Sequence, residues 1–433
     1  MALGGGSFTN YNKVLPGTYI NFVSSANVSG AVGDRGVCAV AMELDWGKEG
    51  EMVAVTAEEF NKNSLKLFGY TVTSSKLNPL KDLFMNASLT YVYRLGTGVK
   101  ASCSLGEAKC SGVAGNAIKI KVAANIDDAA LFDVTTYFRG SRVDTQCVTD
   151  ATTLTDNDYV HWDTECTLTA GIVDMTGGAN ARVTGADYQA FLDAAEAVRF
   201  NTLAVASEDN EVNSLVAAYT KRMRTERGIK FQSVLYNCEA DDMGIINVAT
   251  PATSVGFSHA SLVWFVAGAT AGCSVNKSLT NKVYNGSFNV TNNYTQSELE
   301  EGIKAGKLLL HRVDGTLRVL CDINSLVNTT AEVGDVFKEN QTVRIVDQIA
   351  YDDATLFTTK YLGVVPNDEA GRLSLWNDIV EHRKSLQRMR AIENFKDEDV
   401  RVERGNSKTS VVISCAICPI NSMTQLYMTT TLE

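Results

Sequence analysis

Hydrophobic and polar residues alternate toward both ends of the 433-residue chain, which is the period of a β-strand. Toward the C-terminus one alternating set consists of Leu426, Met428, Thr430 and Leu432, with Gln425, Tyr427, Thr429 and Thr431 between them. Near the N-terminus the extended stretch carries Val14, Leu15, Tyr19, Ile20 and Phe22. Chain ends are rarely ordered unless something holds them. The pattern therefore predicts strands at both ends and leaves open whether they pair inside their own chain.

The middle of the chain has a different pattern, in which amphipathic helices alternate with short buried strands. Thr184, three residues before Asp187, predicts a capping box that opens a helix. Further strands and helices follow, up to a hairpin whose Asp314-Gly315 pair is a strong signal for a tight turn. Such alternation predicts an α/β layer domain with a mainly parallel sheet.

Two flanking regions differ from this α/β part. The stretch 96–175 is rich in Gly, Thr and short β runs, so we expect a small all-β domain inserted into the chain. The last hundred residues predict two long helices, at 338–359 and 371–394, followed by strands. The predicted fold class is α/β multidomain, with an α+β C-terminal domain and extended arms. The predicted segments are 1–22 (arm), 23–95 (N-terminal part of the core), 96–175 (inserted β domain), 176–335 (α/β domain) and 336–433 (C-terminal domain and arm).

Composition narrows the range of functions. The formal net charge of −11 argues against general binding to nucleic acid or to anionic membranes. No apolar run approaches the length of a membrane span, and we expect no secretory signal. The ten cysteines are expected to be free thiols that behave as small buried hydrophobes.

Motifs with catalytic or metal-binding chemistry are weak in this sequence. Ser258-His259 lacks the nucleophile-elbow pattern, and Ser258 is better explained as a helix cap. The glycines and lysine at 302–308 lack phosphate-loop spacing. Cys415 and Cys418 lie in a β run without further ligands, which favours structural cysteines. We therefore expect no catalytic, metal or cofactor site.

Several segments, in order, carry a strong resemblance to one family. They are "VLPGTYINF" at 14–22, "GVAGNAIKI" at 112–120, "WFVAGATAG" at 264–272, "TLRVLCDINSL" at 316–326, "VRIVDQIAYD" at 343–352 and "YLGVVPNDEAGRLSLW" at 361–376. The chain resembles contractile tail sheath proteins of bacteriophages and phage-tail-like bacteriocins of Gram-positive hosts. The turn at 177–182, "GGANAR", has one residue more than the family's motif.

This resemblance implies a structural, non-enzymatic subunit without a cofactor. Such subunits form stacked hexameric rings around an inner tail tube and contract to drive it through a cell envelope. The implied partners are other copies of the chain, the tail tube protein, and baseplate and tail-terminator proteins, with no direct nucleic-acid contact and no membrane insertion. The implied location is the virion tail, assembled in the host bacterial cytoplasm. The terminal arms would add strands to neighbouring subunits.

The resemblance also implies a tube-attachment helix near 371–391. Five basic residues against two acidic ones make 371–390 locally positive. The expected attachment residues are Arg372, Trp376, Ile379, Arg383, Lys384, Arg388 and Arg390. On an ideal helix, Arg372, Arg383 and Arg390 would share one face. The alternative is that these arginines pair with carboxylates inside the subunit. Other readings of the whole chain are a different tail or baseplate protein of related fold, or a hydrolase-like α/β enzyme.

Overall fold

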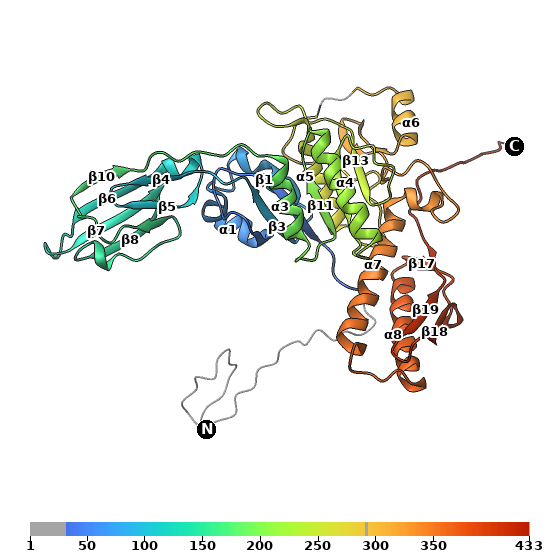
Figure 1. Ribbon diagram of the computed structural model, residues 1–433. Coiled ribbons are helices and arrows are strands. Elements are labelled where there is room, and N and C mark those ends of the chain that lie inside the picture. Colours follow the sequence, from blue (N-terminus) through green and yellow to red (C-terminus); the bar gives the residue numbers. More distant parts are fainter. Residues whose placement is uncertain (1–31, 291–292, 433) are drawn as a thin grey trace, which may run out of the picture. The chain divides into compact units, whose positions relative to one another are not determined.

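The structure, a computed structural model, describes residues 32–290 and 293–432. The chain forms two compact units. The larger unit comprises Asp34–Gln348 together with the residues from Ile420 onward. The smaller unit comprises Ile349–Pro419 together with the residues up to Gly33. Figure 1 shows the elements of both units.

A seven-stranded sheet lies at the centre of the larger unit, in the order β14-β13-β12-β11-β1-β3-β2. Neighbouring strands are parallel except for the pair of β2 and β3. The strands are β1 Val37–Glu43, β2 Met52–Thr56, β3 Leu89–Leu95, β11 Thr202–Val205, β12 Gln232–Tyr236, β13 Ile245–Val248 and β14 Lys307–Leu308. The predicted parallel α/β layer is confirmed, and the sheet also takes three strands from the first hundred residues.

Helices cover both faces of this sheet (Figure 1). On one face lie α1 Ala57–Phe68, α2 Asn78–Phe84 and α5 Leu262–Gly272, which share one hydrophobic cluster with the strands. On the other face lie α3 Gly185–Ala195 and α4 Asn210–Thr225. Sheets covered on both faces have strands that are apolar along their length, and β11 and β13 are buried throughout.

Local signals in the sequence fix two features of this unit. The predicted capping box is present at α3, where the Thr184 backbone N–H donates to the Asp187 carboxylate at 2.7 Å. The predicted hairpin joins β15 Leu310–Val313 to β16 Thr316–Val319. Its two turn residues, Asp314 and Gly315, both have positive φ, as a two-residue turn of this kind requires. Helix α6, Gln296–Lys304, precedes β14.

The inserted β region forms two antiparallel sheets, β10-β6-β7-β8 and β4-β5-β9. Its strands are β4 Lys100–Cys103, β5 Gly106–Ser111, β6 Ile118–Ala124, β7 Phe132–Phe138, β8 Ser141–Val148, β9 Val160–Trp162 and β10 Gly171–Asp174. Its core includes Trp46 from the preceding region, which packs 4.9 Å from the ring of Phe138. The chain enters and leaves side by side, because Val99 and Ala179 exchange backbone hydrogen bonds.

The smaller unit combines two helices with short strands. It contains the C-terminal part of α7 Asn340–Leu356, a π-helical segment Phe357–Tyr361, and α8 Glu369–Arg388. Its strands are β17 Ile392–Glu393, β18 Val400–Arg404, β19 Val411–Cys415 and β20 Cys418–Pro419.

Helix α8 ends earlier than the predicted 394, because Arg390 adopts a left-handed conformation. The Ala391 N–H then donates to the Leu386 carbonyl oxygen at 2.9 Å, which closes the helix with a Schellman-type bond. In the part of the chain that the structure describes, no helix is long and apolar enough to cross a membrane.

Candidate assembly surfaces

Helix α8 carries the residues expected to contact a tube, and two of them lie inside the smaller unit. Ile379 is buried, and the Arg383 side chain is only 2% exposed. Both terminal nitrogens of Arg383 donate to the Asp353 carboxylate on α7, one of them at 3.0 Å. Arg383 also donates to His382 Nδ1 at 2.6 Å. Arg383 therefore joins α8 to α7.

The electrostatics of Arg383 agree with this internal role. Burial by itself lowers the pKa of the guanidinium, because the charged form loses water. Hydrogen bonds and the charge of Asp353 outweigh the burial, so the pKa of Arg383 is raised above its usual value. A buried arginine that stays charged needs such a partner, since an unpaired buried charge is costly.

The other expected attachment residues are distributed over the helix surface. Trp376 Nε1 donates to the Val400 carbonyl oxygen at 2.9 Å, which fixes α8 against β18. Arg372 donates to the Asn367 carbonyl oxygen at 3.0 Å. Two exposed ion pairs follow, Lys384 with Asp397 at 2.8 Å and Arg388 with Glu381 at 2.7 Å.

The expected stripe of Arg372, Arg383 and Arg390 is therefore not one surface. Arg383 is internal, and Arg390 lies beyond the end of α8. Arg390 is exposed and has no ion-pair partner among the residues that the structure describes. The basic groups that remain on the surface gather at the C-terminal end of α8, on Lys384, Arg388 and Arg390.

A buried carboxylate holds the start of the described chain. The Gly33 N–H donates to Asp352 at 3.2 Å, and His382 Nε2 lies 2.8 Å from the same carboxylate. His382 Nδ1 accepts from Arg383, so the Nε2 atom carries the proton that is donated to Asp352. The chain that follows the predicted N-terminal arm is thus tied to α7 and α8. The arm residues Val14, Leu15, Tyr19, Ile20 and Phe22 lie outside the described residues.

The hairpin of β18 and β19 is a two-stranded sheet among the described residues. Val411, Ile413 and Cys415 alternate along β19, so their side chains share one face. Val400 of β18 lies directly opposite Cys415 and is buried, and Trp376 of α8 donates to its carbonyl oxygen, so this face of the hairpin is turned toward the helix. Ile413 nevertheless remains 41% exposed. The face that packs on α8 is therefore incompletely covered at the edge formed by β19.

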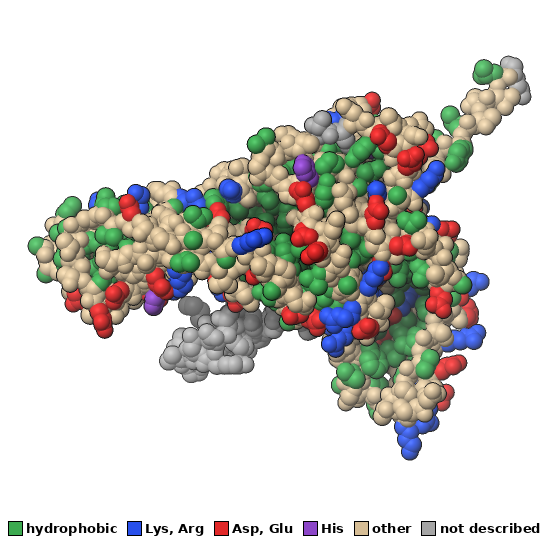
Figure 2. All heavy atoms as spheres, turned by 45° about the horizontal axis from the view of Figure 1, so that its top comes forward, with side chains coloured by type: hydrophobic (Ala, Val, Ile, Leu, Met, Phe, Trp, Pro, Cys, Tyr) green, Lys and Arg blue, Asp and Glu red, His purple; other side chains and the backbone are tan. Residues whose placement is uncertain are grey.

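The C-terminal segment 420–432 is hydrogen-bonded to α7 at its start and is exposed to solvent beyond that point. Gln341 Nε2 donates to the Ile420 carbonyl oxygen at 3.0 Å, and the Gln341 side-chain oxygen accepts from Ser422. Beyond this anchor the expected arm residues Leu426, Tyr427, Met428, Thr430 and Leu432 are exposed, and no strand is assigned to them. Figure 2 shows hydrophobic side chains standing free along this segment.

Comparisons with known proteins cover nearly the whole chain. Four family models match in succession: the tail sheath protein Gp18 domain III N-terminal region at 35–95, the phage tail sheath protein beta-sandwich domain at 96–181, the phage tail sheath protein central domain at 181–325 and the phage tail sheath C-terminal domain at 332–433. The phage-like element PBSX protein XkdK of Bacillus subtilis is 31% identical, over 98% of this chain and 99% of the relative. This chain belongs to the phage tail sheath protein family.

Solved structures agree with this assignment. The crystal structure of the sheath tail protein from Desulfitobacterium hafniense superposes with a TM-score of 0.82 at 31% identity, covering 95% of this chain and 99% of that one. The helical sheath of the anti-feeding prophage in its contracted state has a TM-score of 0.57 at 14% identity, covering 96% and 99%. The second likeness shows a shared fold. The chain is a structural, non-enzymatic tail sheath protein of phage or phage-like particles.

The sequence motifs that could have indicated an enzyme have structural roles in this sheath protein. Ser258 caps the short 3₁₀ turn before α5, and its hydroxyl donates to the Glu208 carboxylate at 2.7 Å. The same carboxylate accepts from the His259 backbone N–H at 2.8 Å. Ser258 is thus bonded to a carboxylate and not to the histidine ring, so the pair forms a cap. Among the described residues, no cluster of His, Cys, Asp or Glu could hold a metal ion.

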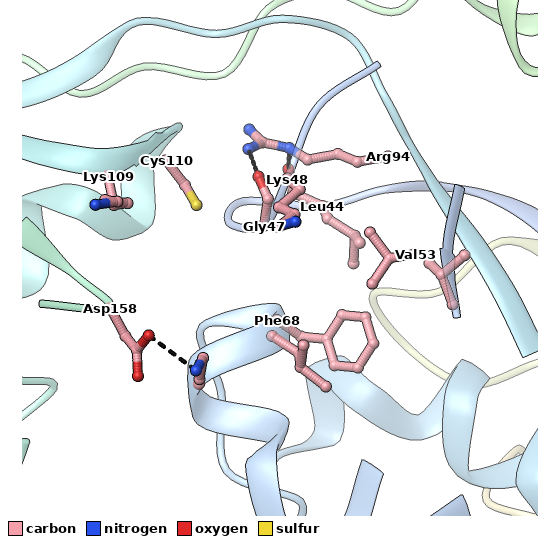
Figure 3. A pocket seen from close by; sticks show the side chains of 12 residues that line it. Leu44, Gly47, Lys48, Val53, Phe68, Arg94, Lys109, Cys110 and Asp158 are labelled. Atoms are coloured by element: carbon pink, nitrogen blue, oxygen red, sulfur yellow. Dashed lines mark hydrogen bonds and ion pairs between the residues drawn. The ribbon is translucent and has the colours of Figure 1, made fainter. Parts of the chain in front are cut away.

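A small apolar cavity of about 180 Å³ lies beside the β region (Figure 3). Leu44, Val53 and Phe68 line it, and lysines stand at its edge. Lys66 is paired with Asp158 at 2.8 Å, and Lys48 with Glu51 at the same distance. These two lysines are already paired with carboxylates, and most of the remaining wall is apolar, so the cavity resembles a packing gap.

The cysteines are free, as expected, but not all are buried. Cys38, Cys238 and Cys273 are buried, and burial raises the pKa of each thiol. Cys147, Cys415 and Cys418 are exposed, which corrects the expectation of buried thiols. The last two lie on β19 and β20.

Proposed function

We propose that this sheath protein polymerises as stacked hexameric rings around an inner tail tube and contracts to drive the tube through the envelope of a target cell. The fold shared with a sheath in its contracted state supports this proposal. The subunit would be assembled in the bacterial cytoplasm and function in the tail of the particle. Its partners would be other copies of itself, the tube protein, and the baseplate and tail-terminator proteins.

The observation that carries the proposal is that the described chain has both an uncovered apolar segment and a strand edge without a partner strand. Residues 423–432 expose apolar side chains, and β19 exposes a strand edge and Ile413. A strand added to an edge gains main-chain hydrogen bonds and buries alternate side chains. The exposed side chains and the strand edge would both be covered if the C-terminal segment of each subunit added a strand to the hairpin of another. We propose the same kind of role for the N-terminal arm.

Tube attachment is proposed for the C-terminal end of α8. Lys384, Arg388 and Arg390 would face acidic groups on the tube, while Arg372 and Trp376 hold the neighbouring loops. Arg383 and Ile379 would act from inside by keeping α8 in place. Exposed ion pairs contribute only about 0–1 kcal/mol each, so the attachment must come from repetition over many subunits.

The region 96–175 is proposed to be an outer domain that takes no part in the links between subunits. The chain enters and leaves this region at adjacent points, because Val99 and Ala179 are hydrogen-bonded to each other. The residues on either side could therefore be joined directly without it. The remaining boundaries, 1–22, 23–95, 176–335 and 336–433, are proposed as the other functional segments.

Truncation tests the proposal. The described part of residues 423–433, up to Leu432, has only exposed side chains, so a subunit without this segment should remain folded and soluble but fail to polymerise. The measurements are circular dichroism for folding and sedimentation with electron microscopy for polymers. Replacing Thr429 and Thr431 with serine in the full chain is the matched control, and it should assemble normally. Normal polymers from the truncated chain would contradict the proposed exchange of this segment.

A further inference from the structure

A second cavity, of about 460 Å³, lies at the carboxyl edge of the central sheet. Three parallel strands, β11, β1 and β3, lie side by side there (Figure 1), and the last residue of each lines the cavity: Val205, Glu43 and Leu95. The connections from β1 to β3 and from β3 to β11 cover opposite faces of the sheet. Open α/β sheets bind ligands outside the carboxyl ends of the strands at such a point. The volume is also within the usual range for small-molecule sites, about 300–1,000 Å³.

Hydrogen bonds hold the loops around this cavity in place. Asn180 Nδ2 donates to the Asp45 carboxylate at 2.7 Å, which joins the loop after β1 to the segment after the inserted β region. The Ser258 hydroxyl donates to Glu208 at 2.7 Å, and the Ser261 hydroxyl donates to the Ser258 carbonyl oxygen at 2.6 Å. These bonds fix the turn before α5. The cavity is therefore built into the fold.

Two charged side chains of the cavity wall have no partner. Glu43 and Lys76 are exposed, and within the described residues neither side chain forms an ion pair or a hydrogen bond. Arg94, which also lines the cavity, is paired with Glu49 at 3.1 Å. Asp45 already accepts the hydrogen bond from Asn180. The free charges of the cavity are thus one carboxylate and one ammonium group.

These two charges come from opposite faces of the sheet. Glu43 lies two residues after Ala41 on β1, so its side chain points to the same face, where Ala41 packs with α3 and α4. Lys76 directly precedes Leu77, which packs with α1, α2 and α5 on the other face. A ligand that contacts both charges must therefore lie across the edge of the sheet.

Aromatic side chains contribute to the rest of the wall. They are Tyr188, Phe257 and Trp264. Burial raises the pKa of Tyr188 to about 12, and the charge of Glu43 adds to this effect. The phenol therefore stays protonated at neutral pH, which leaves Glu43 as the anionic group of this part of the wall. Aromatic faces also attract an ammonium group.

We propose that this cavity binds a small elongated zwitterion, with its ammonium group at Glu43 and its carboxylate at Lys76. Dipeptides and long ω-amino acids belong to this chemical class, because they are neutral overall and carry opposite charges at their two ends. A mainly apolar middle part suits the aromatic wall. The inference is independent of the proposed assembly, since none of these residues lies in the segments proposed to link subunits or to contact the tube.

Ligand-observed NMR with the full-length chain before polymerisation tests the inference. The probes are 6-aminohexanoate and alanylalanine. Hexylamine and hexanoate are the matched controls, because each lacks one of the two charges of 6-aminohexanoate. A hydrogen bond to a charged group is lost with each control, so 6-aminohexanoate should bind about ten-fold or more tightly than either. Glycine, whose charges are adjacent, should bind more weakly than both probes.

Variants of the two charged residues give a second measurement. Glu43→Gln and Lys76→Gln should each weaken the binding of 6-aminohexanoate by about ten-fold or more. Glu58→Gln and Lys62→Gln, which alter an exposed ion pair on α1, are the matched controls and should leave it unchanged. The double variant Glu43→Lys with Lys76→Glu exchanges the two charges, and it should bind the same probe in the reverse orientation.

Several results would overturn the inference. They are the absence of binding by both probes, equal affinities for 6-aminohexanoate and its two controls, and unchanged affinity in Glu43→Gln or Lys76→Gln. Loss of binding when the chain polymerises would also overturn it, because the cavity would then be covered by another copy. Whether polymers form is measured separately, so a failure of the proposed function is distinguishable from a failure of this inference.

Discussion

The pair of Arg383 and Asp353 joins α7 to α8 inside the smaller unit. The guanidinium has lost nearly all contact with water, while the Asp353 side chain is still 31% exposed. Removing one partner of a buried pair leaves a charge without compensation, and this costs more than the intact pair contributes. Arg383 and Asp353 therefore hold α8 in a fixed position on α7, and the residues on the outer side of α8 depend on this position.

Asp353→Asn should destabilise the subunit by about 2–4 kcal/mol, at the lower end for a buried pair because Asp353 is partly exposed. Urea unfolding of the dispersed subunit measures this. Glu381→Gln removes the partner of Arg388 in an exposed pair, and it should cost less than about 1 kcal/mol. Equal losses for the two variants would show that Arg383 does not depend on Asp353.

At the scale of elements, α8 has an inner side that packs and an end that carries surface charge. Leu375, Ile379 and Leu386 are buried on the inner side. Arg388 and Arg390 are exposed near the C-terminal end, where positive charge also suits the helix dipole. Arg383 is therefore unsuitable for testing contact with a tube, whereas Arg388 and Arg390 are suitable.

Reversing charge at Arg388 and Arg390 should give sheaths that lack tubes or occur only in contracted form. The reason is that many weak ion pairs with the tube would become repulsive, an effect that added salt should also reproduce in part. The ratio of sheath to tube protein in purified particles measures it. Reversal at Lys48 and Lys62, which are exposed elsewhere, is the control. Tube-filled extended tails from the α8 variant would refute the attachment.

The inserted β region is the element that can be removed most cleanly. Joining Gly98 to Asn180 uses the point where the two flanking strands already meet. Trp46 must become polar in the same variant, since it is buried in the core of the β region and would otherwise be exposed. We expect such a variant to polymerise, as judged by electron microscopy. A folded variant that forms no sheath would place this region among the contacts between subunits.

For the whole molecule, sequence pattern predicted the layers because they follow from local rules. Buried strand runs, the Thr184 capping box and the Asp314-Gly315 turn each depend on a few adjacent residues. The contacts of α8 could not be predicted in the same way. Asp352 and Asp353 each lie 30 residues before their partners His382 and Arg383, and nothing in the local sequence shows that they meet. Arg390 does not share a helix face with Arg372 as predicted, because its left-handed conformation ends the helix before it.

The proposed assembly depends on where the C-terminal segment of each subunit goes. Among the described residues of one subunit, this segment is uncovered beyond its anchor at Gln341, and no strand pairs with the outer edge of β19. Assembly into a helical array would cover both at once.

The most direct measurement is electron cryomicroscopy of the polymer formed by the full-length chain. We expect hollow cylinders of stacked six-subunit rings in which residues 423–432 of each subunit extend the β18–β19 hairpin of another. A polymer in which this segment pairs with its own hairpin, or a chain that stays monomeric at high concentration with its tube protein present, would contradict the account.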